Sequence, residues 1–348
     1  MVEVAFAIPG ELATPTGGYA YDRRLLELLP AYGITVRHVG LPASFPNPTQ
    51  SDLAETERRL RSTPEGAVLL IDGLAYGAMP VDLIRRLDRR IVALVHHPLG
   101  LEPGLGPERE EALLASEIAA LGEARWVITT SMATARLLAE EFDVPSSRIT
   151  VAEPGTEPAP RAVGTATPVA LLAVGAVSPR KGYNVLVDAL SGLAHLDWRL
   201  TIAGALDRAP EATAALRAVV AAAGFADRIL LAGAVSDAEL AQLYDRADIF
   251  VSPSLFEGYG MVLAEAMARG LPIVASTGGA AADTVPDSAG LKVEPADVTA
   301  LREALRVMIA DPNLRRNLAD GAWAASRTLP RWSDTALRIA EVVTEVAA

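Results

Sequence analysis

The sequence contains no cysteine, only two lysines and no long apolar run. The absence of cysteine excludes disulfides, thiol nucleophiles and cysteine-based metal sites. No stretch of about 18 apolar residues occurs, so the sequence predicts no transmembrane helix. The segment MVEVAFAIPG lacks the basic region and the longer apolar run of a signal peptide. A cytoplasmic protein is therefore the expectation.

An excess of acidic residues gives a formal net charge of −12, from 43 acidic and 31 basic side chains. Phosphate backbones bind to basic faces, so no nucleic acid partner is expected. Four arginines at positions 85, 86, 89 and 90 recur at helical spacing, which is typical of a surface that touches an anionic membrane. Two aspartates interrupt this stripe, so we expect membrane contact to be peripheral at most, and a solvated helix face is the simpler interpretation.

The length of 348 residues exceeds one ordinary core and fits two domains. Short β-rich runs alternate with amphipathic segments through both halves, which predicts an α/β fold with doubly wound parallel sheets. A stretch rich in Pro, Gly and Thr at 154–168 is typical of a linker. We predict Rossmann-like domains at 1–160 and 161–330 that face a central ligand cleft, and a C-terminal helix at 331–348 that packs back on the first domain.

The most informative segment is SLFEGYGMVLAEAMARGLPIVAS at 254–276. It predicts a glycine-bearing loop after a buried strand and then a helix from about Gly260. A helix start has unpaired N–H donors and a partial positive charge. The N–H groups near Gly260, Met261 and Val262 therefore suit a phosphate group.

Two carboxylates flank this helix start, Glu257 in the loop and Glu265 inside the helix. An ionised carboxylate only accepts hydrogen bonds, so the pair suits a ligand with hydroxyl groups on both sides of a phosphate, which describes a nucleotide sugar. The simpler interpretation is a solvated loop residue and a helix surface charge. Against it, the apolar neighbours of Glu265 predict burial, and a buried carboxylate needs a partner.

A basic pair, Arg180 and Lys181, follows the first strand of the second half. At the carboxyl end of a parallel strand, a guanidinium and an ammonium can neutralise a diphosphate, although a solvated basic turn is the alternative. No D-x-D triplet occurs, so the sequence offers no evident metal ligands for a diphosphate, and no metal is expected.

Glycines mark the first loop of the chain. Gly17 and Gly18 form a loop that leads into a helix predicted at Tyr19–Tyr32. Glycine there allows the backbone to approach a ligand closely, or simply makes a turn. No G-x-G-x-x-G fingerprint is present, so a nicotinamide cofactor is not indicated.

Two adjacent histidines end a buried strand of the first half. His96 and His97 lie at the edge where the carboxyl ends of the strands gather, and a neutral imidazole there can hydrogen-bond a sugar hydroxyl. A structural role is the simpler interpretation for each. Glu102 in the following loop is a candidate for contact with an acceptor, with a surface charge as the alternative.

Taken together, these motifs resemble the retaining glycosyltransferases of family 4, which have the GT-B fold of two Rossmann-like domains. The similarity covers almost the whole chain. It is carried by the basic pair after a strand, Y-x-x-A-D at 244–248, E-x7-E from Glu257 to Glu265 and two glycines at 278–279.

The resemblance implies a role for each candidate. Glu257 would contact hydroxyls of the donor sugar, Glu265 would contact those of the ribose, and Arg180 with Lys181 would hold the diphosphate. The other implied donor-side residues are Gly17, Gly18, Gly260, Met261, Val262 and His96, with His97 as the fallback for His96. The acceptor-side candidates are His97 and Glu102.

The implied reaction is the transfer of a hexose from a nucleotide diphosphate sugar to an acceptor hydroxyl, with retention and with neither metal nor other cofactor. We expect a soluble small-molecule or glycan acceptor and a monomer or homodimer. The alternatives are a sugar-nucleotide epimerase or phosphorylase of the same fold, or a non-catalytic nucleotide-sugar-binding scaffold. The sequence leaves open the donor base and sugar, the acceptor, and which of the two histidines faces the donor.

Overall fold

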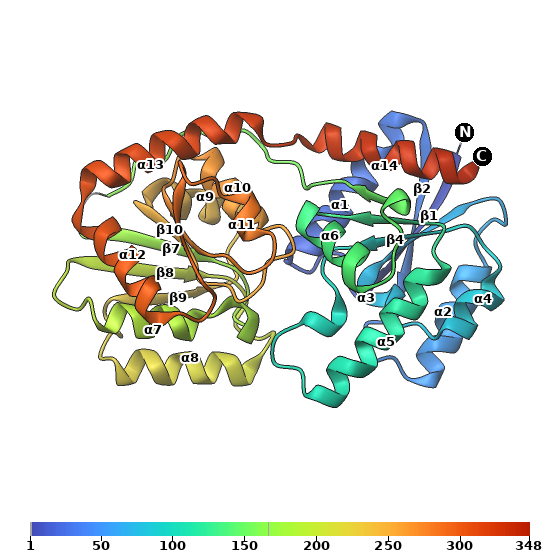
Figure 1. The fold of residues 1–348 in the computed structure, drawn as a ribbon, viewed down its shortest axis with the longest axis horizontal. Coiled ribbons are helices and arrows are strands. Elements are labelled where there is room, and N and C mark those ends of the chain that lie inside the picture. Colours follow the sequence, from blue (N-terminus) through green and yellow to red (C-terminus); the bar gives the residue numbers. More distant parts are fainter. Residues whose placement is uncertain (1, 166) are drawn as a thin grey trace. The chain divides into compact units, whose positions relative to one another are not determined.

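The computed structural model describes residues 2–165 and 167–348. The chain forms two compact units: unit 1 contains the chain up to Gly155 together with Pro330–Ala348, and unit 2 contains Thr156–Leu329. Each unit is built on a six-stranded sheet with helices on both faces (Figure 1). Neighbouring strands are parallel in both sheets. The predicted α/β class, with two doubly wound domains, is confirmed.

Unit 1 orders its strands β2-β1-β3-β4-β5-β6. The order reverses between β1 and β3, and ligands of such sheets bind outside the carboxyl ends of the strands at this switch point. The strands are β1 (Val2–Pro9), β2 (Ile34–Leu41), β3 (Val68–Asp72), β4 (Ile91–Val95), β5 (Trp126–Thr129) and β6 (Ile149–Val151). β3 and β4 are buried along their whole length because helices cover both faces of the sheet.

Helices of unit 1 follow most of these strands. They are α1 (Gly17–Leu28), α2 (Gln50–Arg61), α3 (Gly73–Tyr76), α4 (Val81–Leu87), α5 (Pro107–Glu123), α6 (Met132–Glu141) and α14 (Trp332–Ala347), with short 3-10 helices η1 (Leu29–Tyr32), η2 (Leu99–Leu101) and η3 (Ser146–Arg148).

The first helix differs from its prediction at both ends. α1 begins at Gly17, two residues early, because Thr16 caps it by accepting a hydrogen bond from the Tyr19 N–H. It ends at Leu28, and the chain continues as η1, because Pro30 has no N–H to extend an α-helix. Gly17 and Gly18 therefore lie in the first turn of a helix and not in a glycine loop, so that prediction is wrong.

Unit 2 orders its strands β12-β11-β10-β7-β8-β9, so its switch point lies between β7 and β10. The strands are β7 (Val169–Val174), β8 (Trp198–Ala203), β9 (Ile229–Gly233), β10 (Ile249–Ser252), β11 (Ile273–Ser276) and β12 (Gly290–Val293). The helices are α7 (Tyr183–Ser191), α8 (Pro210–Ala222), α9 (Asp237–Arg246), α10 (Met261–Ala268), α11 (Ala281–Thr284), α12 (Val298–Ala310) and α13 (Pro312–Ala325), with η4 (Pro179–Lys181) and η5 (Ser326–Thr328).

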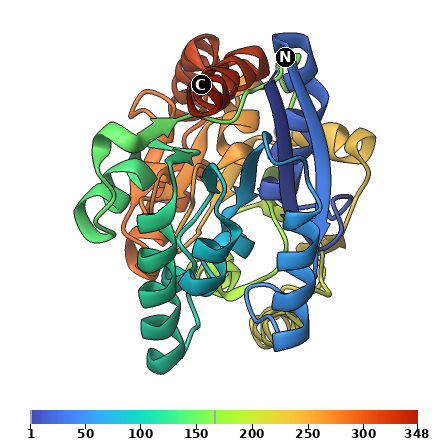
Figure 2. The same ribbon diagram turned by 90° about the vertical axis from the view of Figure 1, so that its right-hand side faces the viewer.

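The C-terminal helix α14 packs on unit 1, across the top of that unit in Figure 2. The Trp332 ring meets the ring of Tyr21 edge to face, with centroids 5.6 Å apart, and Thr335 Oγ1 donates a 2.6 Å hydrogen bond to the Glu153 carbonyl. A Cβ atom at Gly155 would lie 2.1 Å from the Trp332 nitrogen, so this contact requires glycine. Among the described helices, none combines the length and apolar character needed to cross a membrane.

Candidate functional site

Two loops of unit 2 meet at its switch point. Arg180 and Lys181 lie in η4 after β7, and Glu257 lies in the loop after β10. Lys181 Nζ is 2.7 Å from Glu257 Oε1, and Arg180 Nη1 is 3.3 Å from Glu257 Oε2. The structure therefore brings the three candidate catalytic residues of unit 2 into one cluster.

Glu257 is only 5% exposed and is nevertheless ionised. Burial alone would raise its pKa. The charges of Lys181 and Arg180, with hydrogen bonds from Lys181 and Ser254, outweigh burial and lower the pKa of Glu257 to about 2. Ser254 Oγ donates to Glu257 Oε1 over 2.6 Å. Near neutral pH this carboxylate accepts hydrogen bonds and donates none.

The loop after β11 holds the backbone of Glu257. The Glu257 N–H donates to the Gly278 carbonyl over 3.1 Å, and the Ala280 N–H donates to the Glu257 carbonyl over 2.8 Å. A Cβ atom at Gly279 would lie 2.3 Å from the Glu257 oxygen, and one at Gly278 would lie 2.0 Å from the Leu255 oxygen. The glycine pair is thus required for the packing of these two loops.

Helix α10 begins directly after Gly260, one residue later than predicted. Gly260 has a φ of 87°, in the left-handed region that favours glycine, and a Cβ atom there would lie 2.7 Å from Leu263 Cδ1. The N–H groups of Met261 and Val262 belong to the first helical turn and have no acceptor within the helix. This turn therefore combines free donors with the positive end of the helix dipole.

Glu265 lies further along α10 and is partly buried against α9. The Tyr244 hydroxyl donates a 2.9 Å hydrogen bond to Glu265 Oε2, and the Arg269 guanidinium lies 4.4 Å from the centre of the Tyr244 ring. Burial raises the pKa of Glu265, while the Tyr244 hydrogen bond and the Arg269 charge oppose that rise. Glu265 is therefore a partnered carboxylate and not a solvated helix charge.

In unit 1, His96 lies directly after β4 between two buried carboxylates. His96 Nε2 is 3.3 Å from Asp22 Oδ1 on α1 and 3.3 Å from Asp72 Oδ2 at the end of β3. Asp72 also caps α3, because its Oδ1 accepts a 2.8 Å hydrogen bond from the Leu74 N–H. A Cβ atom at Gly18 would lie 3.5 Å from His96 Cδ2, so the first turn of α1 lies against the imidazole.

The two carboxylates favour the protonated form of His96. Burial alone would lower the pKa of His96, but hydrogen bonds and charges from Asp22 and Asp72 raise it. Burial, reinforced by the charge of Asp72, raises the pKa of Asp22. The sequence interpretation of His96 as a neutral imidazole is therefore replaced by an imidazolium that binds both carboxylates through one nitrogen.

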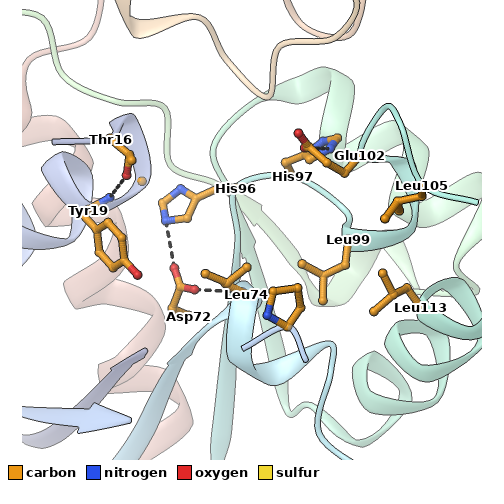
Figure 3. Close-up of a pocket in the computed structure, with 12 residues that line it drawn as sticks. Thr16, Tyr19, Asp72, Leu74, His96, His97, Leu99, Glu102, Leu105 and Leu113 are labelled. Carbon is orange, nitrogen blue, oxygen red and sulfur yellow. Dashed lines mark hydrogen bonds and ion pairs between the residues drawn. The ribbon is translucent and has the colours of Figure 1, made fainter. Parts of the chain in front are cut away.

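A cavity of about 320 Å³ opens beside His96 in unit 1 (Figure 3). Its wall includes His97 and Glu102, whose Nε2 and Oε2 atoms lie 3.2 Å apart. Four of the predicted residues of unit 1, Gly18, His96, His97 and Glu102, thus line one cavity. The other residues that line it are Thr16, Tyr19, Pro46, Asp72, Leu74, Leu99, Leu105 and Leu113.

Glu117 on α5 binds the segment of the cavity wall that contains Leu99. Glu117 is 1% exposed, and its Oε2 accepts a 2.8 Å hydrogen bond from the Leu99 N–H. Burial raises the pKa of Glu117 to about 8, although hydrogen bonds from the backbone of Leu99 and Gly100 act in the opposite direction. This carboxyl group therefore joins α5 to one side of the cavity.

Comparison with known proteins identifies the family that unit 2 resembles. Residues 160–323 match the family model described as Glycosyl transferases group 1. Unit 2 belongs to this family. The D-inositol 3-phosphate glycosyltransferase of Xylanimonas cellulosilytica is 36% identical over 173 residues, which cover 49% of this chain and 41% of that protein. The chain spans about half the length of the first curated relatives that it matches.

Solved structures show the fold of the whole chain. Sucrose-phosphate synthase of Thermosynechococcus elongatus has a TM-score of 0.83 and 24% identity, and the alignment covers 99% of both chains. Anabaena HepE, solved with UDP-glucose, has a TM-score of 0.78 and 18% identity, over 99% of this chain and 100% of that one. The predicted GT-B fold is confirmed.

Several residues near the site in both units were not predicted from the sequence. The sequence could have indicated Asp72, because this residue ends the buried run VLLID at the same sheet edge as His96. The sequence gives no indication of Asp22, because the burial of one acid within a helix is evident only from the packing. The same holds for Ser254, whose hydroxyl group binds Glu257. Tyr244, whose hydroxyl group binds Glu265, begins the Y-x-x-A-D motif, but its contact with Glu265 is evident only in the structure.

One group of side chains in the described part of the chain has the spacing of metal ligands. Ligand atoms of Asp22, Asp72 and His96 all lie within 4.8 Å of one another. The contacts of His96 Nε2 already join the two carboxylates there. In the described residues of unit 2 no such group occurs. Arg180 and Lys181 both lie beside Glu257 in that unit.

Proposed function

We propose that this protein transfers a hexose from a nucleotide diphosphate sugar to an acceptor hydroxyl, with retention of the anomeric configuration and without a metal ion. The observation that carries the proposal is the cluster of Arg180, Lys181 and Glu257 at the switch point of a domain of the glycosyl transferases group 1 family. The named activities of relatives such as the D-inositol 3-phosphate glycosyltransferase support it.

In this proposal Arg180 and Lys181 neutralise the donor diphosphate. The two cations are neighbours in the sequence, and Glu257 holds both of them in place before a ligand binds. The free N–H groups of Met261 and Val262 add donors for phosphate oxygens. Positive groups that are already oriented stabilise the negative charge that develops on the leaving diphosphate, at little cost of reorganisation.

The two glutamates would bind sugar hydroxyls. Glu257 is ionised and accepts hydrogen bonds from hydroxyl groups. Glu265 is oriented by Tyr244 and would accept from the ribose. A double-displacement role for Glu257 is not proposed, because its contacts with Lys181, Arg180 and Ser254 stabilise its negative charge and make it a weak nucleophile.

His96 is the catalytic candidate from unit 1. As an imidazolium it can donate a hydrogen bond to a sugar oxygen, and the two aspartates keep its ring in one orientation. His97 and Glu102 line the cavity next to it and are the proposed acceptor-side residues.

The same cluster supports the proposal that the reaction needs no metal ion. A divalent cation in a sugar-nucleotide site bridges phosphate oxygens, and here two fixed cationic side chains occupy the corresponding role. We expect activity to be unchanged after treatment with EDTA. Loss of activity in EDTA, restored by Mg²⁺ or Mn²⁺, would contradict this part of the proposal.

The test is a panel of UDP, GDP and ADP sugars, with binding measured by thermal shift and transfer measured by nucleotide release. A ligand at about a hundred times its dissociation constant stabilises the folded state by about 2.7 kcal/mol. We expect one nucleotide to stabilise the protein, and NMR of the product to show the anomeric configuration of the donor. An inverted product would refute retention, and the absence of any nucleotide response would refute the donor site.

A further inference from the structure

The cavity of unit 1 has two chemically different walls. Figure 3 shows Thr16, Tyr19, His96 and Asp72 on one side, and Leu99, Leu105 and Leu113 on the other, with His97 and Glu102 above the leucines. Pro46 and Leu74 complete the apolar part, so five of the twelve lining residues are proline or leucine. At about 320 Å³ the cavity lies within the range of roughly 300–1,000 Å³ that small-molecule sites occupy.

The cavity is lined by two carboxylates that are already partnered. Its two carboxylates already face imidazoles, Asp72 facing His96 and Glu102 facing His97, each at 3.2–3.3 Å. The described residues that line the cavity include neither lysine nor arginine. A phosphate or carboxylate on the ligand would lie close to these two carboxylates and would find no guanidinium among the lining residues to bind it through two hydrogen bonds.

The apolar wall is built by two loops that the chain brings to one place. Pro46 comes from the loop between β2 and α2, and Leu99 and Leu105 come from the segment between β4 and α5. Leu99 is held by Glu117 through its backbone N–H, and Leu113 is 3% exposed on α5. These contacts support the apolar wall from behind, so it exists before any ligand binds.

From these observations we infer that the cavity binds an uncharged acceptor that carries an apolar group next to its reactive hydroxyl, such as an alkyl or aryl glycoside. This inference rests on the proposed function, since it names the substrate class of the same reaction. The hydroxyl lies toward His96 and the apolar group lies toward the leucines. A phosphorylated sugar is the wrong class for this cavity.

Binding in the absence of donor tests the inference directly. Isothermal titration compares hexyl β-glucoside, methyl β-glucoside and glucose 6-phosphate, all below the concentration at which the hexyl compound aggregates. Burial of one methylene contributes roughly a fourfold gain in affinity. We therefore expect the hexyl glucoside to bind at least about tenfold more tightly than the methyl glucoside, and glucose 6-phosphate to bind more weakly than either.

Leu105 is the residue to change, because it lies in a loop, lines the cavity and is not part of the buried core. Leu105→Ser should reduce the preference for the hexyl glucoside to below about threefold. Leu105→Trp should fill the cavity and abolish this preference. Leu337→Ser, at a position 44% exposed on α14, is the matched control and should leave the preference unchanged.

The outcomes separate this inference from the proposed function. Equal binding of the two glucosides, no binding of the hexyl glucoside, or tightest binding of glucose 6-phosphate overturns the inference. So does a preference that survives in Leu105→Ser. If the hexyl glucoside binds as expected and no nucleotide sugar is turned over, the proposed function fails and the cavity assignment stands. If transfer proceeds only to phosphorylated acceptors, the function stands and the inference fails.

Discussion

Lys181 Nζ lies 2.7 Å from Glu257 Oε1, and this ion pair joins the loops after two adjacent strands of unit 2, β7 and β10. The side chain of Lys181 is 12% exposed and that of Glu257 is 7% exposed, so water screens the pair little. Removal of one partner would leave the other charge buried and uncompensated. The pair therefore couples the position of the cationic cluster to the position of the glutamate.

Neutralising either partner should impair catalysis. We expect Glu257→Gln and Lys181→Ala each to lower turnover at least about tenfold, because each removes a charge that the donor site uses, while circular dichroism shows a folded protein. Lys292→Ala is the matched control. Lys292 is the other lysine of the chain and pairs with the exposed Asp287, so its loss should change turnover less than about twofold. Wild-type rates in both site variants would remove these residues from the mechanism.

A fall in pH should lower the free energy of unfolding of the wild-type protein, because Glu257 becomes protonated. Its pKa in the folded state, about 2, lies below its ordinary value of 4.5. The stability that this shift contributes is present above pH 4.5 and is lost as the pH falls toward 2. The loss amounts to about 3 kcal/mol, as an order of magnitude. Denaturation between pH 5 and pH 3 should show a steeper loss in wild type than in Glu257→Gln; parallel curves would contradict the shift.

His96 should remain protonated well above neutral pH. The hydrogen bonds and charges of Asp22 and Asp72 raise its pKa to about 10, although burial opposes them. The stabilisation from this shift is complete below pH 6.5 and is lost as the pH rises through about 10. NMR of ¹⁵N-labelled histidine should show an imidazolium signal at pH 8, and Asp72→Asn should lower the pKa of His96. A signal that titrates near 6.5 in wild type would show that the aspartates do not act on it.

Glu117 predicts a pH dependence of the same sign. Burial raises its pKa to about 8 from an ordinary value of 4.5, so its contribution to stability is present below pH 4.5 and is lost as the pH rises through 8. We expect the free energy of unfolding to fall between pH 5 and pH 9 by up to about 5 kcal/mol more in wild type than in Glu117→Gln. Denaturant titrations at the two pH values measure this difference. Equal slopes in the two proteins would show that Glu117 stays ionised.

Much of the fold follows from local pattern. The apolar runs at β3 and β4 and the alternating helical segments predict parallel strands, as the structure has them. The start of α1 lies two residues before its predicted position, because the cap at Thr16 outweighs the glycines that follow it. Capping depends on one side-chain hydrogen bond, which residue type alone does not reveal.

The candidate site, like the fold, can be predicted from the sequence only in part. Arg180, Lys181 and Glu257 stand out in the sequence because each follows a strand of a parallel sheet, and all such strands end at one edge. Strand periodicity and residue type therefore determine the class of fold, the edge where chemistry gathers and most of the candidate residues. These properties depend on neighbours a few positions away in the chain.

Only the tertiary structure decides how those residues are paired. His96 and Asp22 lie 74 positions apart in the sequence, and their contact exists because α1, which follows β1, and His96, which follows β4, lie at the same edge of the parallel sheet. The same packing collects Pro46 and the leucines into one apolar wall. Charge state and cavity shape depend on burial and on distances between distant segments, so they are settled when the chain folds and not by any local pattern.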